Sequence, residues 1–345
     1  MLDSNLKDIL KSIVSFVILV ILVFAFKHSI LDANNIPSGS MIPTLKIGDY
    51  LFVNKMRFSL YFPFTYYQIL HIDDPVRGDI VTFVPPRDPS KNYVKRIIGM
   101  PKDRIRIRNI SICDPTLPIK RAKKTLYQCN QESERKNLIP IIAFVEYKEN
   151  DQGEWKHFDI EEIDYDKAYE ILHDSDSVRV LYPEDRNNQG YLPVLFRETI
   201  NGHIHYFIET AEMMVPDSLC SEIETTGCII PENHYFMMGD NRDDSQDSRF
   251  WQVGPISRDK VLGKPLIIYF SIDWKDQICF AYYEYLGGRY GFSIKNFPPE
   301  KQAKFCSVYD INLYNEDIFS YFKRTIFYRI PRMNVRWYRI GSILE

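Results

Sequence analysis

The sequence predicts a mainly β protein: an antiparallel β-sheet core with a long β-rich insertion, preceded by one N-terminal transmembrane helix. Two observations carry this prediction. An unbroken apolar run lies near the N-terminus, and the rest of the 345-residue chain is rich in strand-forming aromatic residues, with 23 Tyr and 22 Phe. The length leaves room for a sizeable core. The formal net charge of -3 gives no sign of a nucleic-acid partner.

The apolar run predicts a membrane anchor over residues 1–31. From Ser12 to Phe26 every residue is apolar except Ser12 and Ser15. Such a helix rises roughly 22 Å, and continuing it to Leu31, with Lys27 snorkelling, approaches the ~30 Å hydrocarbon core. A cleavable signal peptide is the alternative, but no small-x-small cleavage site follows the run. Lysines flank both ends, so the positive-inside rule does not set the orientation.

Short β-branched and aromatic runs after the anchor predict strands. The runs 49–53 and 79–84 each follow a glycine that can take positive φ, Gly48 and Gly78. The apolar phase slips by one residue at Asn109, which predicts a β-bulge. The other strand-like runs are residues 93–98, 104–108, 234–238 and 264–272.

A shift in composition marks the insertion. A basic patch near residue 120 gives way to an acidic stretch over 149–176, and residues 164–173 are compatible with one short helix. We interpret both charge blocks as solvated surface. The predicted organisation is an anchor over 1–31, core over 32–108, an inserted subdomain over 109–230, core over 231–274, and a C-terminal extension with the end of the core over 275–345.

The cysteines leave two interpretations open. They stand at positions 113, 129, 220, 228, 280 and 306, without a CxxC pair or a histidine at zinc-like spacing. One interpretation is a set of buried thiols. The other is disulfides in an oxidising compartment, with Cys220 and Cys228 closing a short loop.

Two segments of the core carry residues suited to nucleophilic chemistry. Residues 36–45 contain two prolines and a glycine around Ser38 and Ser40, which predicts a rigid turn. In the strand-like run 93–99, alternation makes Lys95 point opposite to Arg96. Burial of this lysine would lower the pKa of its amine, whereas a snorkelling surface lysine is the plainer interpretation.

A third segment is the loop 239–249, Gly-Asp-Asn-Arg-Asp-Asp-Ser-Gln-Asp-Ser-Arg. Its acidic residues do not follow the EF-hand spacing, and we predict no metal or other cofactor there. Internal pairing of its arginines with its aspartates is the favoured interpretation.

Together these segments resemble the bacterial type I signal peptidases (leader peptidases), a family of Ser-Lys dyad serine proteases. The family's motifs are matched in order by residues 38–44, 48–55, 77–83, 95–96 and 239–249, behind an N-terminal membrane segment. The resemblance covers about residues 32–108 and 231–274. The insertion and the stretch after 274 match weakly, apart from Val335-Arg336-Trp337.

The resemblance implies a role for each site residue. Ser40 is the expected nucleophile and Lys95 its base, with the Ser38 hydroxyl and the Ser40 N–H as the oxyanion hole. Ser245 is expected to orient the lysine, and Asp247 with Arg249 to form a structural pair. The chemistry agrees, because a serine hydroxyl needs a base and a lysine serves only when it is neutral near pH 7.

The resemblance further implies a membrane-bound endopeptidase that removes signal peptides from exported preproteins. Its expected partners are those signal peptides and the lipid bilayer. Its expected place is the bacterial inner (cytoplasmic) membrane, single-pass, with the catalytic domain on the outer, periplasmic face. A substrate with small side chains would bind extended along a strand edge. The predicted pocket residues are Ile36, Pro37, Met41, Leu45, Tyr93, Val94 and Gln246.

The sequence departs from the family near the expected substrate channel. Gln246 stands where a small residue is frequent, and Asn34 where an aromatic is common. Cleavage preference is therefore open.

Other functions fit the residues less well. A Ser-His-Asp hydrolase would need a histidine, but all 7 histidines fall outside the motifs and no Gly-x-Ser-x-Gly is present. A Ser-x-x-Lys enzyme is excluded by Pro43, and a self-cleaving Ser-Lys repressor would need a DNA-binding segment. An inactive membrane-anchored scaffold that binds signal peptides is the non-enzymatic alternative.

Overall fold

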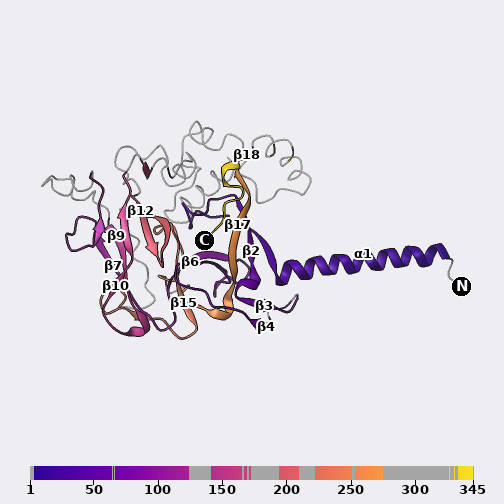
Figure 1. The fold of residues 1–345 in the computed structure, drawn as a ribbon, viewed down its shortest axis with the longest axis horizontal. Helices are drawn as coiled ribbons and strands as arrows, with labels where there is room; N and C mark the ends of the chain where they lie inside the picture. The colour runs from indigo at the N-terminus through magenta and orange to yellow at the C-terminus, as the bar shows by residue number, and fades with distance from the viewer. Residues whose placement is uncertain are drawn as a thin grey trace, which may run out of the picture.

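A long N-terminal helix projects from a β-rich body (Figure 1). The computed structural model describes residues 4–63, 65, 67–123, 141–164, 167–168, 171, 194–209, 222–250, 253–274, 326, 330 and 333–344. The body is built mainly from antiparallel strands. The predicted fold class, a mainly β protein behind one apolar helix, is therefore confirmed.

Helix α1 spans Ser4–Ser29. Its stretch Asp8–Lys27 is long and apolar enough to cross a membrane, and none of that stretch is buried inside the protein. A row of exposed Ile, Leu, Val and Phe side chains is unfavourable in water, so this surface suits a lipid environment.

The main sheet holds the strand runs predicted for the core, except residues 104–108, which lie in another sheet. Its strand order is β1-β2-β17-β5-β6-β15-β16, with β18 pairing β17. The long strand β17 pairs with β5 at Val261 and Gly263 and with β2 from Lys264 to Ser271, with bulges in both pairings. The bounds are β1 Leu31–Asn35, β2 Asp49–Asn54, β5 Ile80–Phe83, β6 Tyr93–Gly99, β15 His234–Met238, β16 Ile256–Ser257, β17 Val261–Trp274 and β18 Met333–Val335.

Strand β1 was not predicted. Its polar sequence Asp32-Ala33-Asn34-Asn35 suggests only an exit from the membrane, yet it pairs with β2 along its whole length. Tertiary pairing here overrides low strand propensity.

Two further sheets come from the predicted insertion and its borders. One has the order β10-β9-β7-β14 and the other β13-β12-β11-β8. Together with residues of β6 and β15 they form the largest hydrophobic core among the described residues, which includes Ile105, Phe144, Phe196, Phe207 and Phe236. The bounds are β7 Arg104–Ser111, β8 Ile119–Lys120, β9 Ile141–Lys148, β10 Lys156–His157, β11 Asp159–Glu162, β12 Val194–Ile200, β13 His203–Glu209 and β14 Cys228–Ile229.

The bulge predicted at Asn109 is wrong. Strands β7 and β9 pair in unbroken register from Arg104 to Ser111. Asn109 keeps its place in the alternation and donates from Nδ2 to Glu224 Oε1 at 2.6 Å. The apolar pattern therefore slips at a half-buried Asn109, next to Ile110, which packs against the core, without an extra residue in the strand.

Two predictions fall largely outside the described residues. Most of the short helix predicted over 164–173 lies there. Of the cysteines, only Cys113 and Cys228 are described, and both are disulfide-bonded, so they are not the buried thiols of the first interpretation. Cys220 lies outside the described residues, and its pairing with Cys228 stays a prediction.

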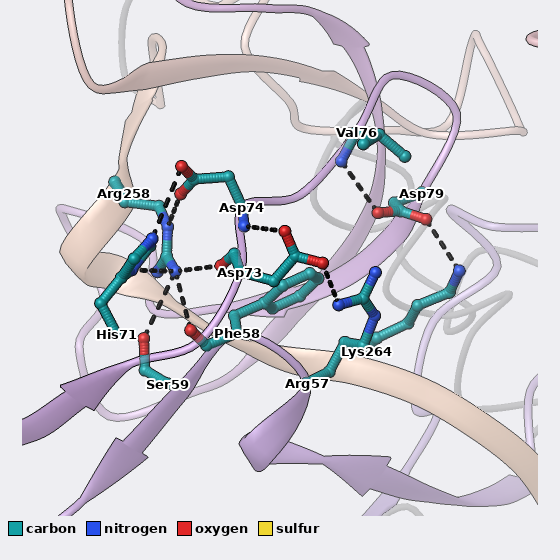
Figure 2. A network of polar contacts seen from close by, with 10 residues as sticks. All are labelled: Arg57, Phe58, Ser59, His71, Asp73, Asp74, Val76, Asp79, Arg258 and Lys264. Atoms are coloured by element: carbon teal, nitrogen blue, oxygen red, sulfur yellow. Dashed lines mark hydrogen bonds and ion pairs between the residues drawn. The ribbon is translucent and has the colours of Figure 1, made fainter.

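A short hairpin of β3 (Ser59–Tyr61) and β4 (Gln68–His71) lies near the base of α1. The Lys55 N–H, just before the hairpin, donates to the Ile30 carbonyl at 2.9 Å. Arg258 fastens the hairpin to the body (Figure 2): its Nε donates to the Asp74 carboxylate at 2.7 Å and its Nη2 to the Asp73 carbonyl at 2.8 Å. Exposed apolar side chains on and beside the hairpin are Phe62, Tyr67, Ile69, Leu70 and Ile72.

The buried carboxylate of Asp49 ties the end of the chain to the start of the core. It accepts from the Lys46 N–H at 2.8 Å, from Ser271 Oγ at 2.6 Å and from Arg339 Nε at 3.0 Å. Gly48 precedes it with φ +86, and a Cβ there would stand 1.9 Å from the Ile272 carbonyl oxygen. The turn before β2 therefore requires a glycine at position 48, and the buried Asp49 carboxylate that follows it requires a charged partner, Arg339.

Substitution Asp49→Asn should destabilise the protein by about 3–5 kcal/mol, because it leaves Arg339 near an uncharged partner in a buried site. The measurement is thermal and denaturant unfolding of the full chain in detergent. Asp73→Asn is the matched control, since Asp73 pairs with Arg57 in the exposed network of Figure 2. Equal unfolding midpoints for the two variants would contradict this account.

Candidate active site

Residues 36–45, here called the nucleophile segment, form consecutive turns between β1 and β2. The Ile42 N–H donates to the Gly39 carbonyl at 3.1 Å, and the Leu45 N–H to the Met41 carbonyl at 2.9 Å. Met41 and Leu45 are buried, while Ser40 is half-buried. Anchored neighbours thus fix a serine whose hydroxyl remains reachable.

Lys95 lies in β6, which is flanked by β5 and β15. It is only 3% exposed, so it is not a snorkelling surface lysine. Its Nζ lies 2.6 Å from Ser40 Oγ. Burial lowers the pKa of Lys95 to about 8, although the carboxylates of Asp247, Asp240 and Asp244 oppose this change.

This geometry can perform base chemistry. With a pKa near 8, an appreciable fraction of the amine is neutral close to neutral pH. A neutral amine accepts a hydrogen bond from the Ser40 hydroxyl, and at 2.6 Å it is within reach of that proton.

Arg96 points the opposite way, as the alternation predicts. Its Nε and Nη2 donate to the two carboxylate oxygens of Asp240 at 2.9 and 2.8 Å. Burial would raise the pKa of Asp240, but the guanidinium of Arg96 holds it below its usual value. Asp240 also accepts from Thr44 Oγ1, so this carboxylate joins β6, the loop 239–249 and the nucleophile segment.

The loop 239–249, here called the catalytic loop, is organised by Asp247. Its carboxylate accepts from the Gly239 N–H at 2.9 Å and from Ser245 Oγ at 2.7 Å, and it pairs with Arg249 Nε at 2.8 Å. Burial opposes the charge on Asp247, yet Arg249 keeps the pKa of this carboxyl below its usual value. The expected pair of Asp247 with Arg249 is thus present as a buried ion pair.

Gly239 brings Ser245 and Ser40 into close proximity. A Cβ on this glycine would stand 2.3 Å from Ser245 Oγ and 2.4 Å from the Ser40 carbonyl oxygen. Only glycine permits this approach. The Ser245 hydroxyl donates to Asp247, which leaves its oxygen lone pairs as acceptors for a donor on its other side.

The remaining predicted residues are distributed unevenly. Ser38 is exposed, with its Oγ 3.5 Å from Ser40 Oγ. Pro37 and Gln246 are exposed and Tyr93 is half-buried. Four predicted pocket residues instead share one buried cluster: Ile36, Met41, Leu45 and Val94. These four side chains therefore pack in the interior and do not form an open surface for a substrate.

Sequence reasoning missed Asn241 and misassigned Arg242. The Asn241 N–H donates to the Ser40 carbonyl at 3.1 Å, and its Nδ2 to the Gly39 carbonyl at 3.2 Å. Arg242 pairs with Glu198 of β12 at 3.0 Å, so internal pairing within the catalytic loop is wrong for this arginine. No sequence signal marks Glu198, which lies far from the motifs on an ordinary alternating strand.

Within the described part of the chain, no group of three or more His, Cys, Asp or Glu side chains is arranged to hold a metal ion.

Comparison with known proteins adds independent findings. Residues 9–270 match the family model of signal peptidase, peptidase S26. Signal peptidase I of Buchnera aphidicola (subsp. Acyrthosiphon pisum) is 31% identical over 275 residues, covering 79% of this chain and 78% of the relative. Signal peptidase I of Aquifex aeolicus is 30% identical over 269 residues, covering 76% and 84%. That of Pseudomonas aeruginosa is 27% identical over 274 residues, covering 76% and 72%.

A solved structure of a signal peptidase I from Enterococcus faecalis is 18% identical and covers 56% of this chain and 97% of that one, with a TM-score of 0.23. The family model spans most of the chain, and the Buchnera relative aligns over more than two thirds of its own length. The resemblance found in the motifs is thereby confirmed, and the chain belongs to the signal peptidase family, peptidase S26.

Proposed function

We propose that this protein is a membrane-bound serine endopeptidase that removes signal peptides from exported preproteins, with Ser40 as nucleophile and Lys95 as general base. The observation that carries the proposal is the 2.6 Å approach of the buried Lys95 amine to Ser40 Oγ, in a chain of the signal peptidase family.

The reaction proceeds through an acyl-enzyme. Neutral Lys95 takes the Ser40 proton as Oγ attacks the scissile carbonyl carbon, and the carbonyl oxygen becomes an oxyanion. The Ser40 N–H and the Ser38 hydroxyl stabilise that oxyanion. The Lys95 ammonium then gives its proton to the leaving amine as the C–N bond breaks. A water attacks the ester, Lys95 takes its proton, and Ser40 Oγ leaves with that proton as the signal peptide is released with a free carboxylate.

Ser245 is proposed to orient the lysine. Its hydroxyl is committed as a donor to Asp247, so its oxygen can only accept from an amine N–H. An amine held in this way keeps its lone pair toward Ser40. A carboxylate in direct contact with the amine would raise the pKa of Lys95 and weaken the base, whereas a hydroxyl does not.

The substrate is proposed to bind extended beside β6, with small side chains next to the cut. Exposed Pro37 and Gln246 and half-buried Tyr93 are the predicted pocket residues that a peptide can reach. Gln246 and Asn34 then tune which side chains are accepted.

Membrane attachment places the enzyme at its substrate. Helix α1 serves as a single-pass anchor in the bacterial inner membrane, and the exposed apolar side chains of the β3–β4 hairpin suit the lipid interface beside it. The catalytic domain is proposed to lie on the periplasmic face, where disulfides such as those of Cys113 and Cys228 persist.

Removal of either member of the dyad should abolish cleavage. Ser40→Ala loses the attacking atom and Lys95→Ala loses the base, while Ser38→Ala loses one oxyanion donor and should slow turnover by about 10²–10³. The assay is cleavage of a preprotein by the purified full chain in detergent. Ser90→Ala, an exposed serine bonded to Asp88, is the control and should keep parental activity. Parental activity of Lys95→Ala would overturn the mechanism.

Activity should rise with pH through about 8, the pKa of Lys95, because only the neutral amine is a base. Well below this value the rate should fall about tenfold per pH unit. Asp244→Asn should shift this rise in activity to lower pH, since the Asp244 carboxylate raises the pKa of Lys95. The measurement is kcat/KM against pH, with the exposed Asp159→Asn as control. An upward or absent shift for Asp244→Asn argues against Lys95 as the titrating base.

The orientation can be tested on whole cells. Protease added outside intact spheroplasts should digest the catalytic domain and leave a protected fragment that contains part of α1. A cytosolic marker protein must stay intact in the same sample. A catalytic domain that resists until the membrane is lysed would place it on the cytoplasmic face instead.

A further inference from the structure

The hairpin of β12 and β13 lies directly against the nucleophile segment. Ile42 packs in a buried cluster with Leu195 of β12 and Ile208 of β13. Strand β13 also pairs with the catalytic loop: the Ile208 N–H donates to the Asp240 carbonyl at 2.8 Å, and the Arg242 N–H to the Ile208 carbonyl at 2.9 Å. A hairpin from the predicted insertion therefore touches both parts of the site.

A buried ion pair joins this hairpin to the loop. Glu198 of β12 is 0% exposed and stands directly opposite His205 of β13. Its Oε2 lies 3.0 Å from Arg242 Nη2 and 3.0 Å from His205 Nε2. Burial opposes ionisation, but Arg242 and His205 hold the pKa of Glu198 below its usual value, so the carboxylate is charged. Arg242 also stacks over Phe207 at 4.0 Å.

The next residue along the loop reaches the nucleophile. Arg242 is held by its side chain on Glu198 and by its N–H on Ile208. Its neighbour Asn241 donates to the carbonyls of Ser40 and Gly39 at 3.1 and 3.2 Å. The ion pair of Glu198 with Arg242 thus holds the catalytic loop in place. The adjacent residue, Asn241, in turn holds the backbone of Gly39 and Ser40.

We propose that Glu198 is a positioning residue for Ser40: through Arg242 and Asn241 it holds the nucleophile peptide at its working distance from Lys95. The inference rests on the proposed function, because it requires Ser40 to be the attacking residue. It also gives the β12–β13 hairpin a role in turnover. A displacement of about 1 Å at a reacting group costs on the order of 10² in rate, so a distant carboxylate can matter.

The test compares Glu198→Gln, Arg242→Met and the double variant in preprotein cleavage by the full chain. Glu198→Gln keeps the shape but leaves the Arg242 charge unpaired. It should lower kcat by about tenfold or more and change KM by less than about twofold, because no peptide contact is altered. The double variant should lose no more than the worse single variant, since both residues act through one contact.

The matched control is Glu161→Gln on β11 of the same sheet. Glu161 pairs with Arg197 at a partly exposed site, and its loss should leave kcat unchanged. Parental kcat in Glu198→Gln, or losses that add in the double variant, would overturn the positioning role. An inactive parent chain would instead overturn the proposed function, which separates the two failures.

A purely structural role must be distinguished from positioning. Thermal unfolding in detergent is measured for each variant. Each kcat is then calculated per folded molecule, using the fraction of the variant that is folded at the assay temperature. A lower unfolding midpoint with unchanged kcat per folded molecule would overturn the proposal. If Glu198→Gln does not fold, Arg242→Met tests the same contact, because it removes the other partner of the ion pair. It should lower kcat by about tenfold, and unchanged kcat in this folded variant also overturns the proposal.

Discussion

The close contact between a desolvated lysine amine and a serine hydroxyl is the constraint around which the rest of the structure is arranged. An amine in water is almost fully protonated at neutral pH. Lys95 escapes this because its side chain, only 3% exposed, lies between Ser40 and the carboxylates of the catalytic loop, and this burial lowers its pKa to about 8. The main sheet therefore carries the proposed base, while the nucleophile segment and the catalytic loop that lie around its side chain supply the chemical condition it needs.

Charges around this amine are balanced by buried partners. Asp240 faces Arg96, Asp247 faces Arg249, and Arg242 faces Glu198. A bare carboxylate near the amine would favour its protonated form, and a bare guanidinium would be expensive to bury. Pairing each charge limits its field at Lys95. The same pairs fasten β6, the catalytic loop and β12 to one another, so electrostatic balance and geometric support come from the same side chains.

The sequence was sufficient for local chemistry and insufficient for long-range contacts. Strand runs, the apolar helix and the motifs around Ser40, Lys95 and the catalytic loop follow from local patterns. Strand β1 could not be foreseen, since its polar residues form a strand only because β2 is available to pair. The partner of Arg242 was missed for a related reason: a glutamate on an alternating strand looks like surface until the catalytic loop places an arginine against it. The domain boundaries stay predictions.

A base whose strength comes from desolvation links activity to packing. A histidine base would titrate near neutrality even when exposed, whereas Lys95 depends on the exclusion of water around its side chain. Any loosening of the nucleophile segment or the catalytic loop would admit water, raise the pKa of Lys95 toward its ordinary value and weaken the base. The buried cluster of Ile36, Met41, Leu45 and Val94 lies beneath this site. Its tight packing therefore acts on the chemistry as well as on the fold, although none of these side chains takes or gives a proton.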